Sequence, residues 1–366
     1  MAAKSCLVCV AHWVLFALCL KILGLILPTS ITWYYTCPAN ALLYCLLAGW
    51  TYHFTKKRYL GDRIQPQNKA VLITGCDSGF GNLLAKRLDS RGFHVFASCL
   101  FPNGPGAEDL KKSCSKRLQV LELDVTNDES VQNAVNFVKE NIGSSDLWAI
   151  VNNAGVQKGF SIELTGIDEF KDTMEVNAIG PVRVTKAFLP LLRQAKGRVI
   201  NLTSLAGRVT MPHFSPYTTS KFAAVAFTEC LKQEMDVWGV KVISVEPEMF
   251  MTPIIHATIK NIDHTFDSLE KGIRADYGEK FLKGFKVFLE CLTSMASTKI
   301  NIVIDDLESA IALEYPNAIY KPRRNFAARI ACYIFERFPR SVTDWLIRII
   351  FALMGLPIPK EAENTI

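Results

Sequence analysis

Two apolar stretches open the chain, and a different pattern follows them. Residues 6–27 are almost wholly apolar, a break comes at Pro28, and a second apolar stretch covers residues 31–54. Each stretch is about as long as a bilayer crossing, which needs roughly 20 residues. Because Lys4 precedes the pair and three basic residues follow it at 56–58, the pattern predicts a hairpin anchor with both ends in the cytosol. A cleaved signal peptide, or a single span with the rest of the chain in a lumen, are the alternatives.

From Lys69 onward, short apolar runs alternate with longer amphipathic ones. This alternation predicts a parallel sheet with helices on both faces. The expected strands are residues 70–73, 93–97, 118–121, 147–151, 199–202 and 240–245. We therefore predict an α/β fold, with a single Rossmann-like, doubly wound parallel sheet domain in residues 61–320 and an N-terminal membrane anchor in residues 1–60.

Beyond about Tyr320 the chain becomes basic and amphipathic, which marks residues 321–366 as a C-terminal extension. Apolar residues recur there at helical spacing beside Arg348, namely Trp345, Leu346, Ile349, Ile350 and Leu353. Such a helix either packs on the domain or lies on a membrane near the substrate entrance. The sequence leaves both interpretations open.

Composition narrows the partners and metals to be considered. The chain has 366 residues, of which 49% are hydrophobic, and a formal net charge of +6. This surplus is mild and no long basic run carries it, so no nucleic-acid partner is expected. The 11 cysteines are scattered without paired metal-ligand spacing. Neither a metal site nor a disulfide scaffold is predicted.

A glycine-rich turn follows the first expected strand. Its glycines permit a tight turn and let backbone N–H groups approach a pyrophosphate, and the N-terminus of the next helix adds a favourable dipole. The residues expected to bind a dinucleotide there are Thr74, Gly75, Asp77, Ser78, Gly79, Phe80 and Gly81.

The choice between NAD and NADP depends on charge at the end of the second expected strand. A 2′-phosphate favours Arg or Lys there, whereas a free ribose hydroxyl accepts a carboxylate. Residues 97–101 contain neither, and Asp77 in the first turn disfavours a phosphate. NAD is therefore the predicted cofactor, with NADP as the alternative.

Tyr217 and Lys221 lie four residues apart at the start of an expected helix, which places both side chains on one face. A free tyrosine has a pKa near 10. A nearby ammonium and an oxidised nicotinamide both favour the phenolate, which can then remove a proton from a substrate hydroxyl. The pair is common by chance, so its meaning depends on the surrounding motifs.

Those surroundings resemble the short-chain dehydrogenase/reductase family. The glycine turn at 74–81, the run Asn-Asn-Ala-Gly at 152–155, Ser204 thirteen residues before Tyr217, and the Tyr217–Lys221 pair follow the family's order and separations. The resemblance implies an oxidoreductase acting on CH–OH groups with NAD(P). It also implies assembly through long helices, of which a homodimer is one form.

The resemblance assigns a role to each matching residue. Ser204 would bind the substrate oxygen and stabilise developing charge. Tyr217 would be the acid–base, Lys221 would hold the nicotinamide ribose and lower the tyrosine pKa, and Asn177 would support a proton-relay water. The other expected cofactor contacts are Asp124, Val125, Asn153, Ala154, Gly155, Pro247 and Thr252.

One position departs from the family. The family usually has Pro-Gly after its sixth strand, whereas this chain has Pro247-Glu248. The glycine lets the backbone pass close to the nicotinamide, and a glutamate adds a side chain and a negative charge. Either Glu248 faces away, or cofactor binding or activity is altered. The glycosylation pattern at Asn201 is expected to be buried in a strand and unmodified.

The branch of the family that the chain resembles contains type 2 17-beta- and 11-beta-hydroxysteroid dehydrogenases, retinol dehydrogenases and mitochondrial 3-hydroxybutyrate dehydrogenase. Residues 72–81 are typical of this branch, 103–108 are similar to the steroid enzyme, and 215–217 are similar to the hydroxybutyrate enzyme. Substrate contacts are expected from residues 211–214, where His213 is interpreted as a loop or packing residue, with a substrate contact as the alternative. An apolar lid is expected from Ile254, Ile255, Phe266 and Leu269.

Membrane anchoring favours a lipid-like alcohol or ketone, such as a steroid or retinoid, as substrate. A small hydroxy acid is the alternative, for which Lys158 or Arg208 would hold the carboxylate. A membrane-bound dinucleotide-binding protein without turnover is a third reading, suggested by Glu248. The expected location is the endoplasmic reticulum membrane with a cytosol-facing domain, with the mitochondrion as the alternative.

Overall fold

The computed structural model describes residues 2–26 and 38–363, and the chain folds as two compact units. The first unit comprises Met1–Gln65 with Ala312–Pro316, and the second comprises Pro66–Ile311 with Asn317–Ile366. The break expected at Pro28 and the start of the second apolar stretch lie outside the described residues.

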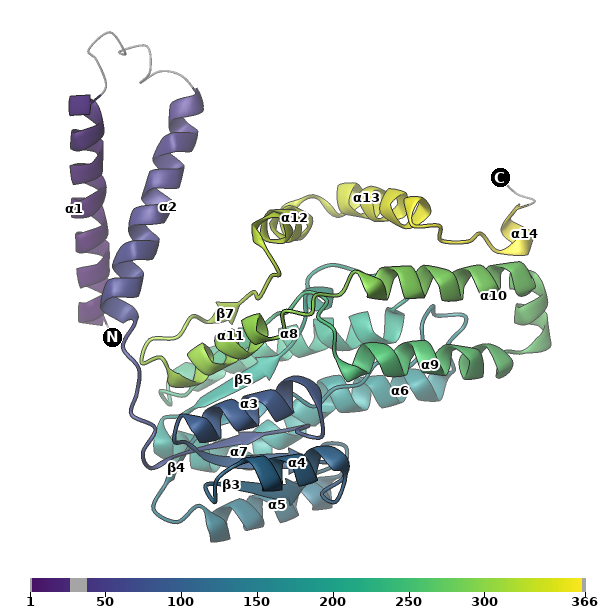
Figure 1. The fold of residues 1–366 in the computed structure, drawn as a ribbon, viewed down its shortest axis with the longest axis horizontal. Helices are drawn as coiled ribbons and strands as arrows, with labels where there is room; N and C mark the ends of the chain where they lie inside the picture. Colours follow the sequence, from purple (N-terminus) through teal and green to yellow (C-terminus); the bar gives the residue numbers. More distant parts are fainter. Residues whose placement is uncertain (1, 27–37, 364–366) are drawn as a thin grey trace. The chain divides into compact units, whose positions relative to one another are not determined.

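Two long helices form most of the first unit, α1 (Ala2–Ile26) and α2 (Pro38–Leu60) (Figure 1). The helices pack on each other where the Thr51 hydroxyl lies 3.1 Å from Nδ1 of His12, with Tyr52 edge-on to the same imidazole. In the part of the chain that the structure describes, no helix combines the length and the apolar content that a bilayer crossing requires.

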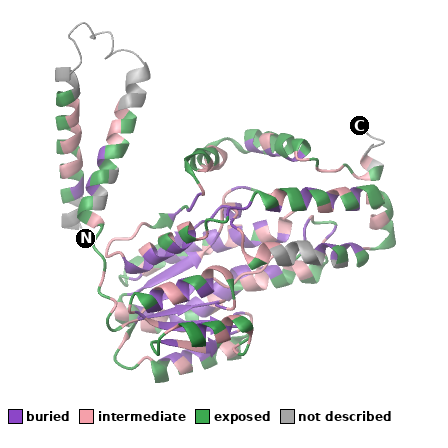
Figure 2. Cartoon of the chain, viewed as in Figure 1, coloured by how far each residue is buried: buried purple, intermediate pink, exposed green. Residues whose placement is uncertain are grey.

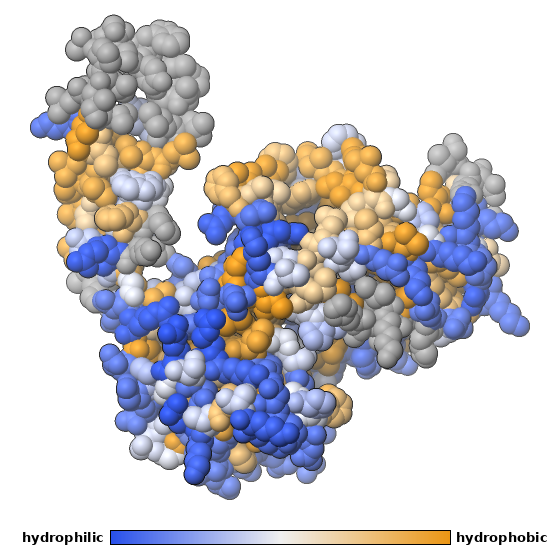
Figure 3. Space-filling model, viewed as in Figure 1, coloured by the Kyte–Doolittle hydropathy of each residue, from blue (hydrophilic) through white to orange (hydrophobic). Residues whose placement is uncertain are grey.

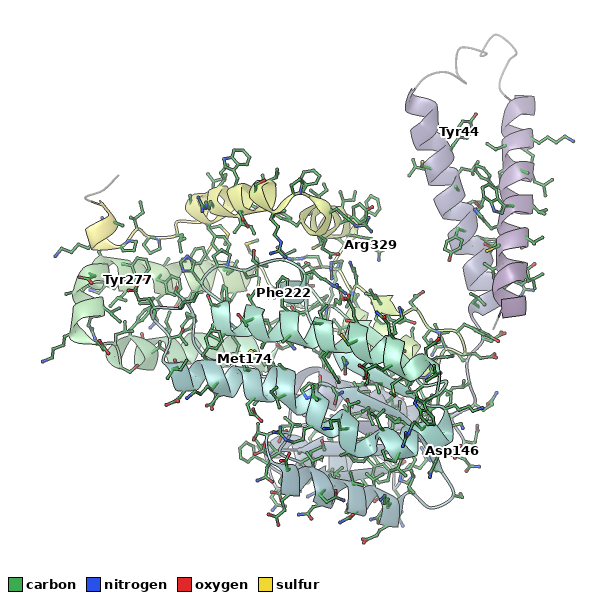
Figure 4. The ribbon with its side chains drawn as sticks, turned by 180° about the vertical axis from the view of Figure 1, so that it is seen from behind. Tyr44, Asp146, Met174, Phe222, Tyr277 and Arg329 are labelled. Atoms are coloured by element: carbon green, nitrogen blue, oxygen red, sulfur yellow. The ribbon has the colours of Figure 1, made fainter. Side chains whose placement is uncertain are left out.

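The second unit is built on a parallel sheet whose strand order is β3-β2-β1-β4-β5-β6-β7. The strands are β1 (Lys69–Ile73), β2 (His94–Cys99), β3 (Leu118–Glu122), β4 (Asp146–Asn152), β5 (Arg198–Leu202), β6 (Lys241–Val245) and β7 (Ile319–Tyr320). Asp146, labelled in Figure 4, begins β4 and pairs with Lys69 of β1 at 2.9 Å. The predicted Rossmann-like sheet is confirmed, with β7 as an additional edge strand.

Helices connect and cover these strands. They are α3 (Gly79–Ser90), α4 (Pro105–Ser113), α5 (Asp128–Asn141), α6 (Ile167–Met174), α7 (Gly180–Ala195), α8 (Ser215–Asp236), α9 (Pro253–Asp267), α10 (Lys271–Ser294), α11 (Asn301–Ala312), α12 (Phe326–Arg337), α13 (Arg340–Leu353) and α14 (Lys360–Glu363). A π-helical turn, η2 (Glu175–Ile179), joins α6 to α7, and a short 3-10 turn, η3 (Leu205–Gly207), follows β5.

The core lies on both faces of the sheet, whose strands are buried while the helices keep exposed outer faces (Figure 2). On one face, Leu72 packs in a cluster with Val135 of α5, Phe188 of α7 and Leu231 of α8. Neighbouring residues on a strand point to opposite faces, so Val71 is directed to the other side. There α3 and α11 are joined by ion pairs from Arg87.

The sheet has a point at which the direction of chain winding reverses. β1 lies between β2 and β4, so successive strands are added first on one side of β1 and then on the other. In such sheets ligands bind in the crevice beyond the carboxyl ends of the strands at this reversal. The turn after β1 and the loop after β4 meet there, and both carry residues singled out in the sequence.

A second apolar cluster is built from helices that follow β6. It joins residues of α9, α10 and α13 with the loop before α6, and its buried members include Phe160, Ile262, Phe285, Phe288 and Phe351. The rings of Phe281 and Phe285 stack with centroids 5.7 Å apart. This cluster gives the region beyond the sheet an apolar interior.

Candidate active site

A cavity of about 490 Å³ opens at the carboxyl ends of the central strands, a size within the usual range for small-molecule sites. Residues from the turn after β1, the loops after β4, β5 and β6, and helices α8, α10 and α13 line it. The predicted site residues among them are Gly75, Asp77, Ser78, Gly79, Phe80, Asp124, Val125, Asn153, Ala154, Gly155, Ser204, Tyr217, Lys221, Pro247 and Thr252.

The glycine turn is shaped by close backbone approaches. Gly75 has φ 70°, and a Cβ on it would lie 2.8 Å from Cα of Ala154. A Cβ on Gly81 would lie 2.5 Å from both the Asn153 side-chain nitrogen and the Gly75 carbonyl oxygen. These contacts exclude larger residues, because real Cβ atoms do not approach other atoms so closely.

Thr74 and Asn153 hold the turn against the end of β4. The Thr74 hydroxyl accepts hydrogen bonds from the backbone N–H groups of Asn153 and Ala154, both at 3.0 Å. The Asn153 side chain donates to the carbonyls of Thr74 at 2.7 Å and Gly75 at 3.0 Å. Thr74 is buried and supports the turn through these bonds. Gly81 has no side chain, which leaves room for the Asn153 amide.

Asp77 connects the glycine turn to the end of β2. Its carboxylate accepts hydrogen bonds from the backbone N–H groups of Leu100 and Phe101, both at 2.9 Å. All three residues line the cavity. Farther along the same wall, the Asp124 carboxylate accepts from the backbone and hydroxyl of Thr126. This end of the cavity therefore presents carboxylates.

Ser204, Tyr217 and Lys221 meet at the inner end of the cavity. Burial raises the pKa of Tyr217, and a hydrogen bond with the Ser204 side chain opposes this effect. Burial lowers the pKa of Lys221 to about 8. The Lys221 ammonium donates to the Leu202 carbonyl at 3.0 Å and lies 5.6 Å from the centre of the Tyr217 ring. Tyr217, whose phenol can give up or accept a proton, is thus held beside the Lys221 ammonium and the Ser204 hydroxyl.

Asn177 lies behind this group, in the π-helical turn η2. Its amide donates to the Val156 carbonyl at 2.8 Å and to the Ser220 hydroxyl at 3.0 Å, while its oxygen accepts from the Val156 N–H at 2.8 Å. The Ser220 hydroxyl in turn donates to the Tyr217 carbonyl at 2.7 Å. Asn177 is buried, and it fixes the loop after β4 to helix α8. Such turns are frequent at functional sites.

The substrate end of the cavity is apolar and only partly as expected. Met211, Phe214, Ile254 and Ile255 line it, as the sequence predicts. Phe266 and Leu269, expected in the lid, instead pack in the second apolar cluster, because the end of α9 and the turn that follows it direct these side chains toward α10. The wall is completed by residues that the sequence did not single out for the site, namely Leu289, Leu292, Thr293 and Phe351.

The C-terminal helix α13 has two different faces. Ile347 and Phe351 are buried against the second apolar cluster, so the helix packs on the domain. Trp345 and Leu353 from the predicted apolar stripe remain 60% and 83% exposed. Phe351, which lines the cavity, lies on the side of the helix opposite this stripe. An apolar residue on that second face is the sequence signal that could have indicated α13 as a wall of the cavity.

Three residues whose roles the sequence left open interact with neighbouring side chains. Lys158 pairs with Asp172 at 2.7 Å, and Arg208 pairs with the buried Glu246 at 2.8 Å. His213 lies 2.7 Å from the Ser161 hydroxyl and packs against phenylalanine rings. The interpretation of His213 as a packing residue is thus confirmed.

Two further expectations concern Asn201 and Glu248. Asn201 is buried, with its side chain bonded to Asn152 and Thr228, which agrees with the expected burial of the glycosylation pattern. Glu248 lines the cavity, and its carboxylate pairs with Arg324 at 2.9 Å. Glu248 thus belongs to the cavity wall, while its carboxylate is directed to Arg324, which compensates its charge.

Comparison with known proteins agrees with this geometry. The family model for short chain dehydrogenase matches residues 69–263. Estradiol 17-beta-dehydrogenase 2 of Mus musculus is 40% identical over 291 residues, covering 78% of this chain and 76% of that protein. The mitochondrial D-beta-hydroxybutyrate dehydrogenase of Rattus norvegicus is 38% identical over 301 residues, covering 79% of this chain and 87% of that protein.

Solved structures show the same fold. A short chain dehydrogenase/reductase from Burkholderia phymatum, in complex with NAD, superposes with a TM-score of 0.61 at 20% identity, covering 74% of this chain and 94% of that chain. This structure supports the fold, and the family match and the similarity to the two dehydrogenases identify the family. It belongs to the short-chain dehydrogenase family and is an NAD(P)-dependent oxidoreductase that acts on alcohols.

Proposed function

We propose that the enzyme transfers a hydride between NAD and the hydroxyl-bearing carbon of an apolar alcohol of the steroid or retinoid type. The observation that carries this proposal is the apolar substrate end of the cavity, where Met211, Phe214, Leu289, Leu292 and Phe351 surround the space beyond Tyr217. Burying a large apolar substrate against such a wall is favourable in proportion to the area removed from water. The steroid named for the mouse relative is consistent with this class.

The cavity fits a dinucleotide, because the glycine turn leaves space that side chains would fill and α3 begins beside it. When bound, NAD supplies the hydride acceptor. Tyr217 removes the proton of the substrate hydroxyl, and Ser204 donates a hydrogen bond to the same oxygen. Lys221, when protonated, favours the phenolate of Tyr217 and holds the ribose.

Asn177 supports the proton path through its bonds to Val156 and Ser220, which keep helix α8 and the loop after β4 in register. In the free pocket burial keeps Tyr217 protonated and pushes Lys221 toward its neutral form. Positive charge brought by the oxidised nicotinamide acts in the opposite direction on Tyr217. Proton removal is thereby favoured when the oxidised cofactor is present.

The preference for NAD over NADP is supported by Asp77. Its carboxylate is fixed by the N–H groups of Leu100 and Phe101, at the end of β2 where the adenosine ribose is expected. A 2′-phosphate placed there would meet this negative charge, whereas a ribose hydroxyl would donate to it. Steady-state kinetics with both dinucleotides test the preference, and a higher kcat/KM with NADP would contradict it.

A hydroxy acid is the second candidate substrate, because a D-beta-hydroxybutyrate dehydrogenase is similar over most of both chains. The cations expected to hold its carboxylate are already paired, Lys158 with Asp172 and Arg208 with Glu246. Freeing Lys158 would break its pair with Asp172, and freeing Arg208 would leave the fully buried Glu246 with only Lys321, 4.0 Å away, as a cationic partner among the described residues. This arrangement favours the apolar alcohol.

Membrane association is also part of the proposal. On α12 and α13, Phe326, Tyr333, Trp345 and Leu353 are all more than half exposed. Figure 3 shows hydrophobic residues gathered over these two helices. Residues 321–353 carry seven Lys and Arg against two Asp and Glu, and Arg329 on α12 is labelled in Figure 4. Aromatic and apolar groups beside basic ones are typical of helices that lie on anionic lipid.

The N-terminal unit supports the same conclusion. Large apolar side chains of α1 that are at least half exposed are Leu7, Val10, Trp13, Val14, Leu18 and Ile22. Contiguous exposed apolar surface of this kind marks a site of interaction with lipid or protein. We place the enzyme on the endoplasmic reticulum membrane with its catalytic domain in the cytosol, and the mitochondrial membrane is the alternative.

The decisive experiment uses the full chain in detergent with NAD and three substrates, a 17-hydroxysteroid, retinol and D-3-hydroxybutyrate. The proposal expects a higher kcat/KM for the steroid or the retinol. Turnover confined to hydroxybutyrate would contradict it. Cell fractionation with carbonate extraction tests membrane association, and light scattering tests whether the detergent-solubilised chain is a homodimer.

A further inference from the structure

Glu248 lies in the wall of the cofactor cavity at a position where the family usually has glycine, and its carboxylate is directed to Arg324. Its side chain is only 5% exposed. The loop that carries it, residues 246–252, also contributes Pro247 and Thr252 to the lining, and these are the residues expected beside the nicotinamide. An uncompensated charge here would interact with a positively charged nicotinamide ring bound beside this loop.

Arg324 supplies the compensating charge from a distant part of the sequence. Its Nε and Nη2 atoms both lie 2.9 Å from Oε2 of Glu248, and its backbone N–H donates to Oε1. The guanidinium also donates to the Met295 carbonyl. Arg324 thus joins the loop after β6, the end of α10 and the segment between β7 and α12. The planar guanidinium suits such a fixed set of acceptors.

Backbone bonds hold the same loop independently of this ion pair. The N–H of Leu205 donates to the Pro247 carbonyl at 2.9 Å, and the N–H of Ser297 donates to the Met249 carbonyl at 3.0 Å. The N–H of Met251 donates back to the Ser297 carbonyl at 2.9 Å. The path of the loop is therefore fixed without Arg324, which leaves the charge of Glu248 as the property that Arg324 controls.

We propose that Arg324 is a positioning residue that sets the charge of the nicotinamide end of the cavity, and through it the balance between oxidised and reduced cofactor. This inference rests on the proposed function. The oxidised nicotinamide ring carries a positive charge and the reduced ring is neutral. With Glu248 paired, the wall discriminates little between them, whereas an unpaired Glu248 carboxylate favours the oxidised ring.

The test measures dissociation constants for NAD and NADH by fluorescence titration of the full chain in detergent, without substrate. Arg324→Gln removes the compensating charge, and Arg324→Lys keeps it. Glu248→Gln combined with Arg324→Gln removes both charges, and the first substitution also keeps the size of the side chain that lies in the cavity wall. Arg340→Gln is the matched control, because Arg340 is an exposed cation of the same C-terminal extension. Thermal unfolding of each variant checks that it is folded.

We expect Arg324→Gln to raise the ratio of the NADH to the NAD dissociation constant about fivefold, the size of a Coulomb interaction between unit charges a few ångströms apart where water has access. The double variant and Arg324→Lys return the ratio to within about twofold of the wild type. Arg340→Gln leaves it unchanged.

Two results would overturn the inference. One is an unchanged ratio in a folded Arg324→Gln protein, and the other is an equal loss of affinity for both dinucleotides that the double variant does not reverse. Both leave the proposed function intact, since the wild type still binds NAD. A wild-type chain that binds neither dinucleotide would instead refute the proposed function itself.

Discussion

Lys221 carries an ammonium group in a buried position, so replacing it with methionine is expected to stabilise the fold while removing activity. The residue is 6% exposed, and burial lowers its pKa from 10.5 to about 8. A lowered pKa means that the folded protein binds this proton less tightly than the unfolded chain does. Methionine has a similar length and no charge, so the substitution removes that cost.

The expected size follows from the pKa and from one hydrogen bond. The change from 10.5 to about 8 corresponds to about 3 kcal/mol at pH 7. Methionine also loses the bond to the Leu202 carbonyl, which is 3.0 Å long and contributes about 1 kcal/mol. The net stabilisation is about 2 kcal/mol, which corresponds to a rise in Tm of about 5 °C for a domain of this size.

The effect has a defined pH window. Because the folded-state pKa of Lys221 is lower than the unfolded value, the unfolded chain binds more protons between about pH 8 and pH 10.5. The stability of the wild type therefore rises with pH across that window relative to the variant. Below about pH 8 the full cost is present, and the advantage of Lys221→Met shrinks as the pH approaches 10.5.

The assay is thermal unfolding of the detergent-solubilised proteins from pH 7 to pH 10, without dinucleotide. Lys186→Met, at an exposed position on α7, is the control and is expected to change Tm little. The reasoning is refuted if Lys221→Met lowers Tm at pH 7, or if its difference from the wild type does not vary with pH.

Three further predictions follow from the turn, the cofactor choice and the membrane face. Gly81→Ala places a Cβ 2.5 Å from the Asn153 side chain, and fluorescence titration is expected to show about tenfold weaker NAD binding; unchanged affinity would contradict the close fit. Asp77→Asn removes a charge, so kcat/KM with NADP relative to NAD is expected to rise about tenfold, and an unchanged ratio argues against this role. Trp345→Glu with Leu353→Glu is expected to remove the protection of residues 340–353 from hydrogen exchange that phosphatidylcholine–phosphatidylserine vesicles confer, although the N-terminal unit still holds the chain on the vesicles; unchanged protection would exclude α13 as a lipid contact.

The sheet could be predicted from the sequence because its central strands are buried on both faces. Such strands appear as short apolar runs, and residues 70–73 and 240–245 are examples. β7 was missed because it has only two residues, Ile319 and Tyr320, and owes its place to pairing with β6. A strand of that length leaves no periodic signal.

The residues near the cofactor turn were predictable because they lie in short motifs with fixed spacing. The substrate wall was not, because Leu289 and Phe351 reach it from helices whose positions depend on long-range packing. The same limit explains Phe266, which periodicity places on an apolar face without indicating whether that face meets the cavity or the core. The partner of Glu248, Arg324, lies 76 residues away and could not be inferred from spacing.

The central claim is that Tyr217 is the acid–base of an alcohol dehydrogenase. Tyr217→Phe keeps the ring and removes the hydroxyl, so it tests this role with little change in packing. The measurement is the single-turnover rate of NADH formation with the preferred alcohol, together with the NAD dissociation constant of the same variant. We predict a rate at least about a hundredfold lower with NAD affinity within about twofold of the wild type. A variant that forms NADH at a rate near that of the wild type would contradict the account.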